Sequence, residues 1–307
     1  MRRALFIVNP DSGKGDGEET SRRAATLLEE SFDAVDRRLS ESAADVEAWG
    51  REAREEGFDA VFVMGGDGTV GRCLRGLLGD APEGARLPAF GVVPGGTGNG
   101  FARTVGIPPD PERAVRAYDF SRTRPLDVGL VGGVPFAYTV TAGSLPEGIR
   151  EVPSESKSRF GFLAYVASEL SRIGNDEQHR LRIVADGEEV VEDISSFVAF
   201  SANDLVNEFT AAKDTRIDSG KIHLIALKSA SVASLLSIIP DAIARSVDES
   251  DQTLFLQGES IEVSCLDGDL TCGVDGDEGP RLPVRLSVAP GAVRMFALKD
   301  AEESDDA

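Results

Sequence analysis

Residues 60–70, Ala-Val-Phe-Val-Met-Gly-Gly-Asp-Gly-Thr-Val, constrain the fold more than any other stretch. The apolar run has the length and β-branched content of a strand buried on both faces, and it ends on two glycines before a helical pattern begins. Such glycines allow positive φ and leave no Cβ between the main chain and a ligand. A helix that begins near Thr69 would direct unpaired N–H groups toward a bound phosphate. The stretch therefore predicts a strand, a phosphate-binding loop and a helix; the alternative is an ordinary tight turn in which Asp67 is the N-cap.

Two further glycine-rich loops follow apolar strands. Residues 4–8 lead into Asn-Pro-Asp-Ser-Gly-Lys-Gly at 9–15, and residues 88–93 lead into Pro-Gly-Gly-Thr-Gly-Asn-Gly at 94–100. Ligands of open α/β sheets bind outside the carboxyl ends of neighbouring strands, so we expect the three loops to converge on one crevice. Convergence favours a ligand site over three unrelated turns. The first loop lacks the Walker A sequence, and Lys14 is either a charge for a phosphate or a solvated loop lysine.

The charge balance is strongly acidic, with 53 Asp and Glu against 32 Lys and Arg and a net charge of −21. Such an excess is typical of a halophile, because concentrated salt screens the self-repulsion; an acidic protein of an ordinary organism is the alternative. Either interpretation disfavours nonspecific nucleic-acid binding.

The cysteine content and the hydropathy pattern limit the cellular location of the protein. Cys73, Cys265 and Cys272 form no C-x-x-C pair, which disfavours a zinc site and fits a reducing cytoplasm. No stretch approaches the roughly 20 apolar residues of a membrane span. We expect a cytoplasmic protein that is at most peripheral at the membrane.

The pattern changes near residue 125. Strand–helix alternation precedes it, whereas short alternating runs with turn signals follow, the last of them at 284–288 and 292–298. We predict a nucleotide-binding α/β domain with a parallel sheet at 1–124, a β-sandwich-like acceptor domain at 125–300 and an acidic disordered tail at 301–307. Helical stretches at 160–173 and 232–247 interrupt the second domain. The apolar side of the 232–247 helix would either pack in the core or contact a bilayer or a bound lipid. Core packing is favoured, because an apolar stripe on a helix usually faces the core.

Three motifs together resemble the diacylglycerol kinase catalytic-domain family, which includes bacterial soluble lipid kinases and sphingosine kinases. They are Asn-Pro at 9–10 with Ser-Gly-Lys at 12–14, GGDGT at 65–69, and P-x-GTGN at 94–99 with Phe-Ala-Arg at 101–103. GGDGT is shared with NAD kinases, but its pairing with P-x-GTGN-x-FAR is specific. The resemblance spans nearly the whole chain. It implies an α/β nucleotide-binding domain followed by a β-sandwich domain, with ATP and Mg²⁺ as cofactors and a lipid as substrate.

The resemblance also implies roles for single residues. Backbone N–H groups of residues 65–69 hold the triphosphate, and hydroxyls of Thr69, Thr97 and Ser40 orient it. Asp67 binds the magnesium ion directly or through water. The predicted nucleotide-binding residues are Asn9, Lys14, Ser40, Gly65, Gly66, Asp67, Gly68, Thr69, Gly96, Thr97, Gly98 and Asn99.

The turn at residues 273–280 carries the implied catalytic base. The family usually has Asp-Gly-Glu here with the Glu as base, and by position Asp277 takes that place with a side chain one methylene shorter. Glu278 is the second candidate. Without the resemblance, the turn is a hairpin loop whose carboxylates face water.

Two further positions depart from the family pattern. Gly100 stands where the family commonly has Asp after GTGN. Ser219 stands where the structural magnesium segment has Asp, which makes Asp218 the substitute candidate for a metal ligand.

The sequence thus predicts an ATP-dependent kinase that phosphorylates a hydroxyl of diacylglycerol, another long-chain alcohol, a sphingoid or an isoprenoid glycerol lipid. Transient contact with a membrane surface would accompany this activity. The sequence leaves open whether the protein forms a homodimer. An NAD kinase-type phosphotransferase is one alternative. An NAD(P)-dependent oxidoreductase would rest on G-x-G-x-x-G at residues 66–71. A non-catalytic nucleotide-binding regulator would explain the departures at Gly100, Ser219 and Asp277.

Overall fold

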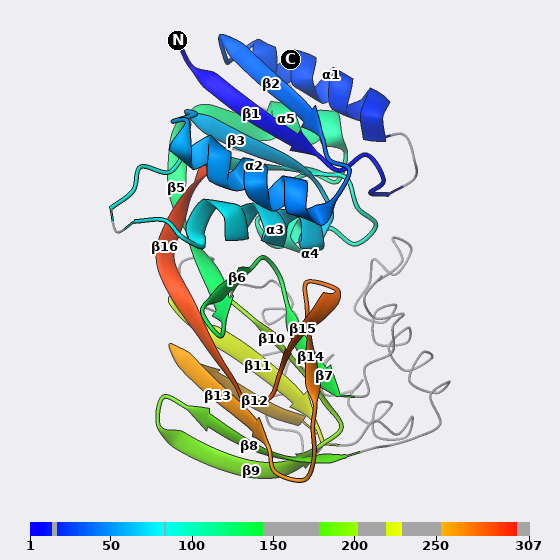
Figure 1. Cartoon of the computed structure of the whole chain (residues 1–307), viewed down its shortest axis with the longest axis vertical. Helices are drawn as coiled ribbons and strands as arrows, with labels where there is room; N and C mark the ends of the chain where they lie inside the picture. The colour runs from blue at the N-terminus through cyan, green and yellow to red at the C-terminus, as the bar shows by residue number, and fades with distance from the viewer. Residues whose placement is uncertain (14–16, 83, 144–177, 202–218, 229–252, 300–307) are drawn as a thin grey trace. The chain divides into compact units, whose positions relative to one another are not determined.

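A computed structural model describes residues 1–13, 17–82, 84–143, 178–201, 219–228 and 253–299 (Figure 1). The chain forms two compact units. The first comprises Met1–Val128 with Pro290–Ala307, and the second comprises Gly129–Ala289. Two long strands, β5 (Tyr118–Val131) and β16 (Val284–Leu298), each contribute residues to both units.

A parallel sheet forms the centre of the first unit. Its strands follow the order β2 (Ala34–Leu39), β1 (Arg3–Val8), β3 (Ala60–Gly65) and β4 (Ala89–Pro94), and Met295 of β16 pairs with Phe90 of β4. Every residue of β3 is buried, as is expected of a strand with helices over both faces. In Figure 1, α2 crosses in front of these strands and α5 lies behind them.

Five helices accompany this sheet among the described residues: α1 (Gly17–Glu29), α2 (Ala43–Glu55), α3 (Asp67–Leu78), α4 (Gly100–Thr104) and α5 (Pro111–Ala117). A capping box starts α2, because the Ser42 hydroxyl accepts the Asp45 N–H while the Asp45 carboxylate accepts the Ser42 N–H. Helices α2 and α3 pack tightly: a Cβ on Gly76 would lie 2.0 Å from the Glu47 carbonyl oxygen.

Aromatic side chains from both ends of the chain fill the core of the first unit. Phe296 of β16 stacks on Phe62 of β3, with ring centroids 5.5 Å apart and planes at 4°. The buried Tyr118 hydroxyl accepts the Val92 N–H and donates to the Val92 carbonyl, both at 2.8 Å. Strand β16 therefore completes the core of the first unit, far in sequence from the strands that it packs against.

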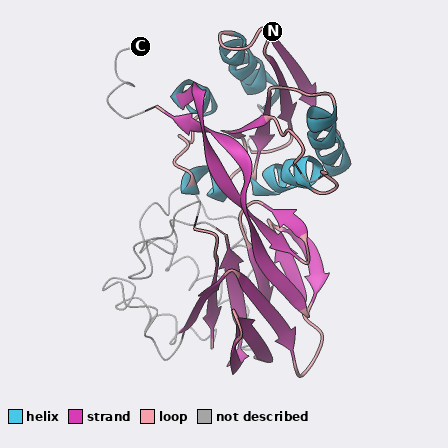
Figure 2. Ribbon diagram, turned by 90° about the vertical axis from the view of Figure 1, so that its left-hand side faces the viewer, coloured by secondary structure: helices cyan, strands magenta, loops and turns pink. Residues whose placement is uncertain are grey.

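The second unit is built from antiparallel sheets. One has the order β12 (Thr253–Gly258), β11 (Ile222–Leu227), β10 (Ser196–Phe200), β7 (Val140–Gly143), β14 (Thr271–Val274) and β15 (Asp277–Arg281). The first part of β16 pairs with β13 (Ser260–Cys265), which is followed by β8 (His179–Ala185) and β9 (Glu188–Ile194), while β6 (Val134–Phe136) pairs with β5. Buried residues of both sheets form one core, and Figure 2 shows only strands and loops among the described residues of this unit.

The predicted fold class, an α/β domain followed by a β-sandwich-like domain, is confirmed. The predicted helices at 160–173 and 232–247 and the tail at 301–307 lie outside the described residues. Among the residues that the structure describes, no helix has the length and apolar character needed to cross a bilayer.

Candidate functional site

The three predicted loops lie together at the carboxyl ends of β1, β3 and β4. The Asn9 N–H donates to the Met64 carbonyl at 2.9 Å, and the Gly95 N–H donates to the Gly65 carbonyl at 3.0 Å. The backbones also approach closely, because a Cβ on Gly13 would lie 2.4 Å from the Gly95 carbonyl oxygen. The sheet order places these loops side by side, and their main chains form a single surface.

Gly65, the last residue of β3, is needed for close packing, and neither Gly65 nor Gly66 has a positive φ. Gly66 has φ −88° and ψ −175°, so the expectation that the chain turns there through positive φ is wrong. A Cβ on Gly65 would lie 2.5 Å from the Thr69 side chain, and a Cβ on Gly96 would lie 2.6 Å from the Gly66 Cα. Positive φ occurs instead at Gly13, +83°, and at Asn99, +48°.

Asp67 joins the second loop to the third. It is the first residue of α3, but its carboxylate accepts the N–H groups of Gly100 at 2.9 Å and Phe101 at 2.8 Å, at the start of α4. The alternative in which Asp67 caps its own helix is therefore wrong, because Gly66 is the N-cap of α3. Burial raises the pKa of the Asp67 carboxyl above its ordinary value, although these two N–H groups and the nearby Arg103 charge act in the opposite direction.

Asn9 joins the first loop to α3. Its side-chain amide nitrogen donates to the Thr69 hydroxyl oxygen at 3.2 Å, while its side-chain Oδ1 accepts the Asp11 N–H at 3.1 Å. Thr69 is buried in the first turn of α3. Because its oxygen accepts this bond, its proton stays available for donation to another acceptor, such as a phosphate oxygen.

Asn99 closes the third loop on itself. Its side-chain oxygen accepts the Gly96 N–H at 2.9 Å, and its amide donates to the Gly96 carbonyl at 2.6 Å. Between them, Thr97 is exposed, and a Cβ on Gly98 would lie 3.9 Å from an Asp67 carboxylate oxygen. The loop therefore presents Thr97 at its surface while Gly98 passes beside Asp67.

The remaining predicted nucleotide-binding residues are placed as follows. Gly68 lies in the first turn of α3. Ser40 is buried just after β2, and both its N–H and its hydroxyl donate to the Val8 carbonyl, at 2.8 and 3.2 Å. Ser40 thus lies beside the end of β1, and its role in nucleotide binding stays a prediction. Lys14 and Asp218 lie outside the described residues.

The predicted base lies on a hairpin of the second unit. Asp277 opens β15 and pairs with Val274, and both Asp277 and Glu278 are exposed. The turn consists of Asp275 and Gly276 with φ of 52° and 95°, as in a two-residue hairpin. Both carboxylates are therefore accessible to solvent.

Sequence reasoning gave no role to Asp275 or to Arg103. The Asp275 carboxylate accepts the N–H groups of Ala137, Tyr138 and Thr139 at 2.8, 2.7 and 3.1 Å, and so holds the hairpin in place. The exposed Arg103 of α4 brings positive charge to the loops. The Phe-Ala-Arg motif at 101–103 is the sequence signal that could have identified Arg103 as a site residue.

Comparison with known proteins identifies the family. Residues 3–131 match the diacylglycerol kinase catalytic domain, and residues 140–297 match the YegS C-terminal NAD kinase beta sandwich-like domain. A Streptococcus pneumoniae protein named "Putative lipid kinase" is 31% identical over 97% of this chain and 98% of its own. The chain belongs to the diacylglycerol kinase catalytic-domain family.

Other members of this family agree in length and fold. The diacylglycerol kinase of Bacillus subtilis is 28% identical, with all of both chains covered. A crystal structure described as a "putative diacylglycerol kinase" from Bacillus anthracis has a TM-score of 0.75 at 21% identity and covers 96% of this chain and 94% of its own. At that identity the likeness concerns the fold. The resemblance stated from the three motifs is confirmed, and the chain is a member of a lipid kinase family.

Proposed function

We propose that this protein is a kinase that uses ATP and Mg²⁺ to phosphorylate a hydroxyl of diacylglycerol or another long-chain glycerol lipid. The single observation that carries the proposal is the joining of three glycine-rich loops through Asp67 and Asn9. The names of the relatives support the acceptor class. Because such an acceptor resides in a bilayer, transient contact with a membrane surface belongs to the proposal.

The loops supply the groups that a polyphosphate requires. The first intrahelical bond of α3 runs from the Val70 N–H to the Gly66 carbonyl, so the N–H groups of residues 67–69 precede the helical ladder. Unpaired N–H groups and the positive end of the helix dipole bind phosphate oxygens. The Thr69 hydroxyl proton adds a further donor, and Arg103 adds positive charge. Close backbone packing fixes these donors before the nucleotide arrives.

The Asp67 carboxylate is also suited to bind a magnesium ion. Each of its oxygens accepts one backbone N–H, so each retains a lone pair for a hard cation or its water shell. When bound, Mg²⁺ would offset charge on the β- and γ-phosphates. The backbone bonds hold the carboxylate in one orientation without a side-chain rearrangement.

Asp277 is the proposed general base. Its carboxylate takes the proton of the acceptor hydroxyl while that oxygen forms the new bond to phosphorus and the bond to ADP breaks. The hairpin that carries it is held by the three N–H groups bound to Asp275. Glu278, the next residue, is the second candidate.

Incubation with labelled ATP, Mg²⁺ and separate acceptors in concentrated KCl tests the proposal. The acceptors are diacylglycerol, a sphingoid base, an isoprenoid glycerol lipid and NAD. We expect label in a glycerol lipid. Label in NAD would support the NAD kinase alternative, and tight ATP binding without any transfer would support the regulator.

A further inference from the structure

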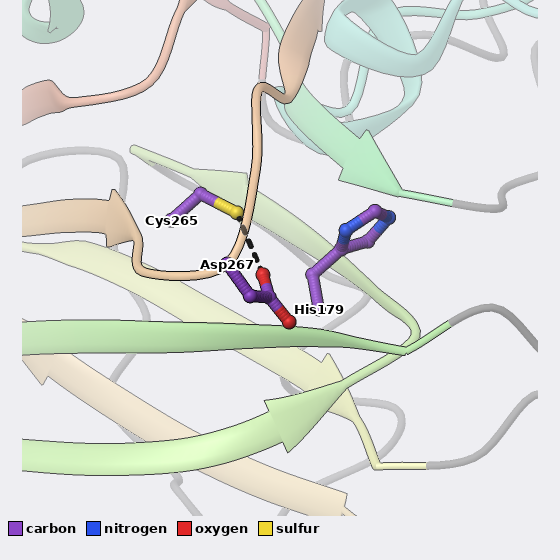
Figure 3. Close-up of side chains that lie close together, drawn as sticks. All are labelled: His179, Cys265 and Asp267. Carbon is purple, nitrogen blue, oxygen red and sulfur yellow. Dashed lines mark hydrogen bonds between the residues drawn. The ribbon is translucent and has the colours of Figure 1, made fainter.

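Three side chains of types that can ligate a metal lie together in the second unit, and none of them belongs to the loops or the hairpin described above. They are His179 at the start of β8, Cys265 at the end of β13 and Asp267 in the turn that follows (Figure 3). Cys265 pairs with Leu181 across the two strands. Because side chains two positions apart on a strand share a face, His179 projects to the same face as Leu181 and Cys265.

The spacing of these side chains is compatible with one metal ion. The imidazole, sulfur and carboxylate ligand atoms lie within 4.8 Å of one another. A tetrahedral zinc ion with bonds of about 2.0 to 2.3 Å brings its ligand atoms to about 3.3 to 3.8 Å. Small side-chain rotations close the difference. His179 and Cys265 are half-buried and Asp267 is exposed, so an ion has access from solvent.

The carboxylate is already held in place for such an ion. One Asp267 oxygen accepts the Arg180 N–H at 2.8 Å, and the other accepts the Cys265 thiol at 3.2 Å, as the dashed line in Figure 3 marks. The backbone bond is the kind of outer contact that orients a metal ligand. A metal ion would take the place of the thiol proton between sulfur and oxygen.

We propose that His179, Cys265 and Asp267 bind one divalent transition metal ion of the zinc class, with water as the fourth ligand. A nitrogen, sulfur and oxygen set suits Zn²⁺ or Co²⁺, whereas Mg²⁺ and Ca²⁺ prefer oxygen alone. Binding forms a metal–sulfur bond and releases the Cys265 proton to solvent without any change of oxidation state. The ion would connect the end of β13 to the start of β8 and stabilise the second unit. The C-x-x-C pattern is absent because the ligands come from segments that meet only in the fold.

Cobalt titration of the full chain tests this site, because Co²⁺ bound to thiolate gives a charge-transfer band that oxygen ligands do not. Excess Mg²⁺ occupies oxygen-only sites during the titration. We expect a band that saturates at one equivalent, disappears on addition of Zn²⁺ and is absent in Cys265→Ser. His179→Gln and Asp267→Asn should each weaken cobalt binding at least about ten-fold.

Asp269→Asn is the matched control. It removes the same charge from the same turn, its side chain is 85% exposed, and it should leave the titration unchanged. No band at stoichiometric cobalt would overturn the proposal, and so would a band that persists in Cys265→Ser. Loss of the band in Cys265→Ser alone, with normal affinity in the His179 and Asp267 variants, would also overturn it, since sulfur alone would then bind the ion. Zn²⁺ should raise the unfolding midpoint of the wild type and not that of Cys265→Ser.

Discussion

The Asp67 carboxylate accepts the Phe101 N–H at 2.8 Å, across 34 positions of sequence. With the adjacent bond from Gly100, this contact fixes the start of α4 against the start of α3. A residue predicted to bind the metal ion therefore also holds the third loop in position. Substitutions of Asp67 should therefore affect both roles.

Asp67→Asn should lower kcat by about a hundred-fold or more, and it should weaken ATP binding less. The amide retains one acceptor oxygen but directs N–H donors toward a backbone N–H, and it removes the anion proposed to bind Mg²⁺. Steady-state kinetics and ATP titration measure the two effects. Asp110→Asn is the control, because the Asp110 carboxylate likewise accepts a backbone N–H at the start of a helix, that of Arg113 at 2.9 Å. It should change stability by only about a few tenths of a kcal/mol, because Asn and Asp cap helices about equally well, and it should leave kcat unchanged. Equal kinetic losses in both variants would contradict a special role for Asp67.

Gly96→Ala and Gly66→Ala should differ in kind. A Cβ on Gly96 would lie 2.6 Å from the Gly66 Cα, so we expect a loss of roughly 2 kcal/mol or more in the free energy of unfolding. A Cβ on Gly66 would lie 3.6 Å from the Gly96 Cα at a negative φ, so the fold should persist while ATP affinity falls. Thermal melts and ATP titration distinguish the two. Normal ATP affinity in a folded Gly66→Ala would contradict the loop assignment.

Asp277→Asn should lower kcat by a factor of order 10² to 10⁴ and leave ATP binding intact, as is usual for a positioned general base. Asp277→Glu restores the family residue and tests whether the hairpin follows family geometry. Glu278→Gln is the neighbouring control and should retain most of the activity. Full turnover in Asp277→Asn together with inactivity in Glu278→Gln would assign the base to Glu278.

His223 should make the second unit sensitive to acid. It is buried on β11, stacks on Phe255, and neither ring nitrogen has a hydrogen-bond partner in the part of the chain that the structure describes. Burial and, to a smaller extent, the Lys221 charge lower the pKa of His223 from 6.5 to about 4. The unfolded chain therefore binds this proton near pH 6.5 and the folded chain only near pH 4. Stability is retained above pH 6.5 and falls toward pH 4, by at most about 3 kcal/mol.

His223→Leu should remove this part of the acid dependence. Urea unfolding between pH 4 and 8 measures it, and the gain over wild type should be larger at pH 5 than at pH 8. His179→Gln with a chelator present is the control, because it removes the other histidine of the chain. A gain that does not change with pH would contradict the assignment of the titration to His223.

The strands and loops of the first unit could be predicted from the sequence, whereas most contacts among them could not. Strands β1 and β3 are continuous apolar runs, and glycines mark the loops that follow. The Asp67 carboxylate accepts the N–H groups of Gly100 and Phe101, 33 and 34 positions away, and no local sequence pattern reports such a contact. The positive φ expected at Gly65 and Gly66 was wrong; close packing against Thr69 requires a glycine at position 65, whereas position 66 has room for a Cβ.

The end of the chain shows a second limit. Two separate runs at 284–288 and 292–298 were expected, whereas β16 is continuous from Val284 to Leu298. Pro290 and Gly291 lie between these two runs. Within the continuous strand, Gly291 adopts φ +57° and donates its N–H to the Asp127 carboxylate of β5 at 2.7 Å. That bond joins residues 164 positions apart in the sequence, and local sequence patterns do not indicate contacts between such distant positions.

The most direct test of lipid phosphorylation is the initial rate at which the purified protein forms phosphatidic acid from diacylglycerol vesicles, ATP and Mg²⁺ in concentrated KCl. The proposal predicts ATP-dependent product with the wild type, nearly normal rates with Asp110→Asn, and a rate at least about a hundred-fold lower with Asp67→Asn. Wild-type protein that binds ATP, remains folded and yet forms no phosphorylated lipid would contradict it.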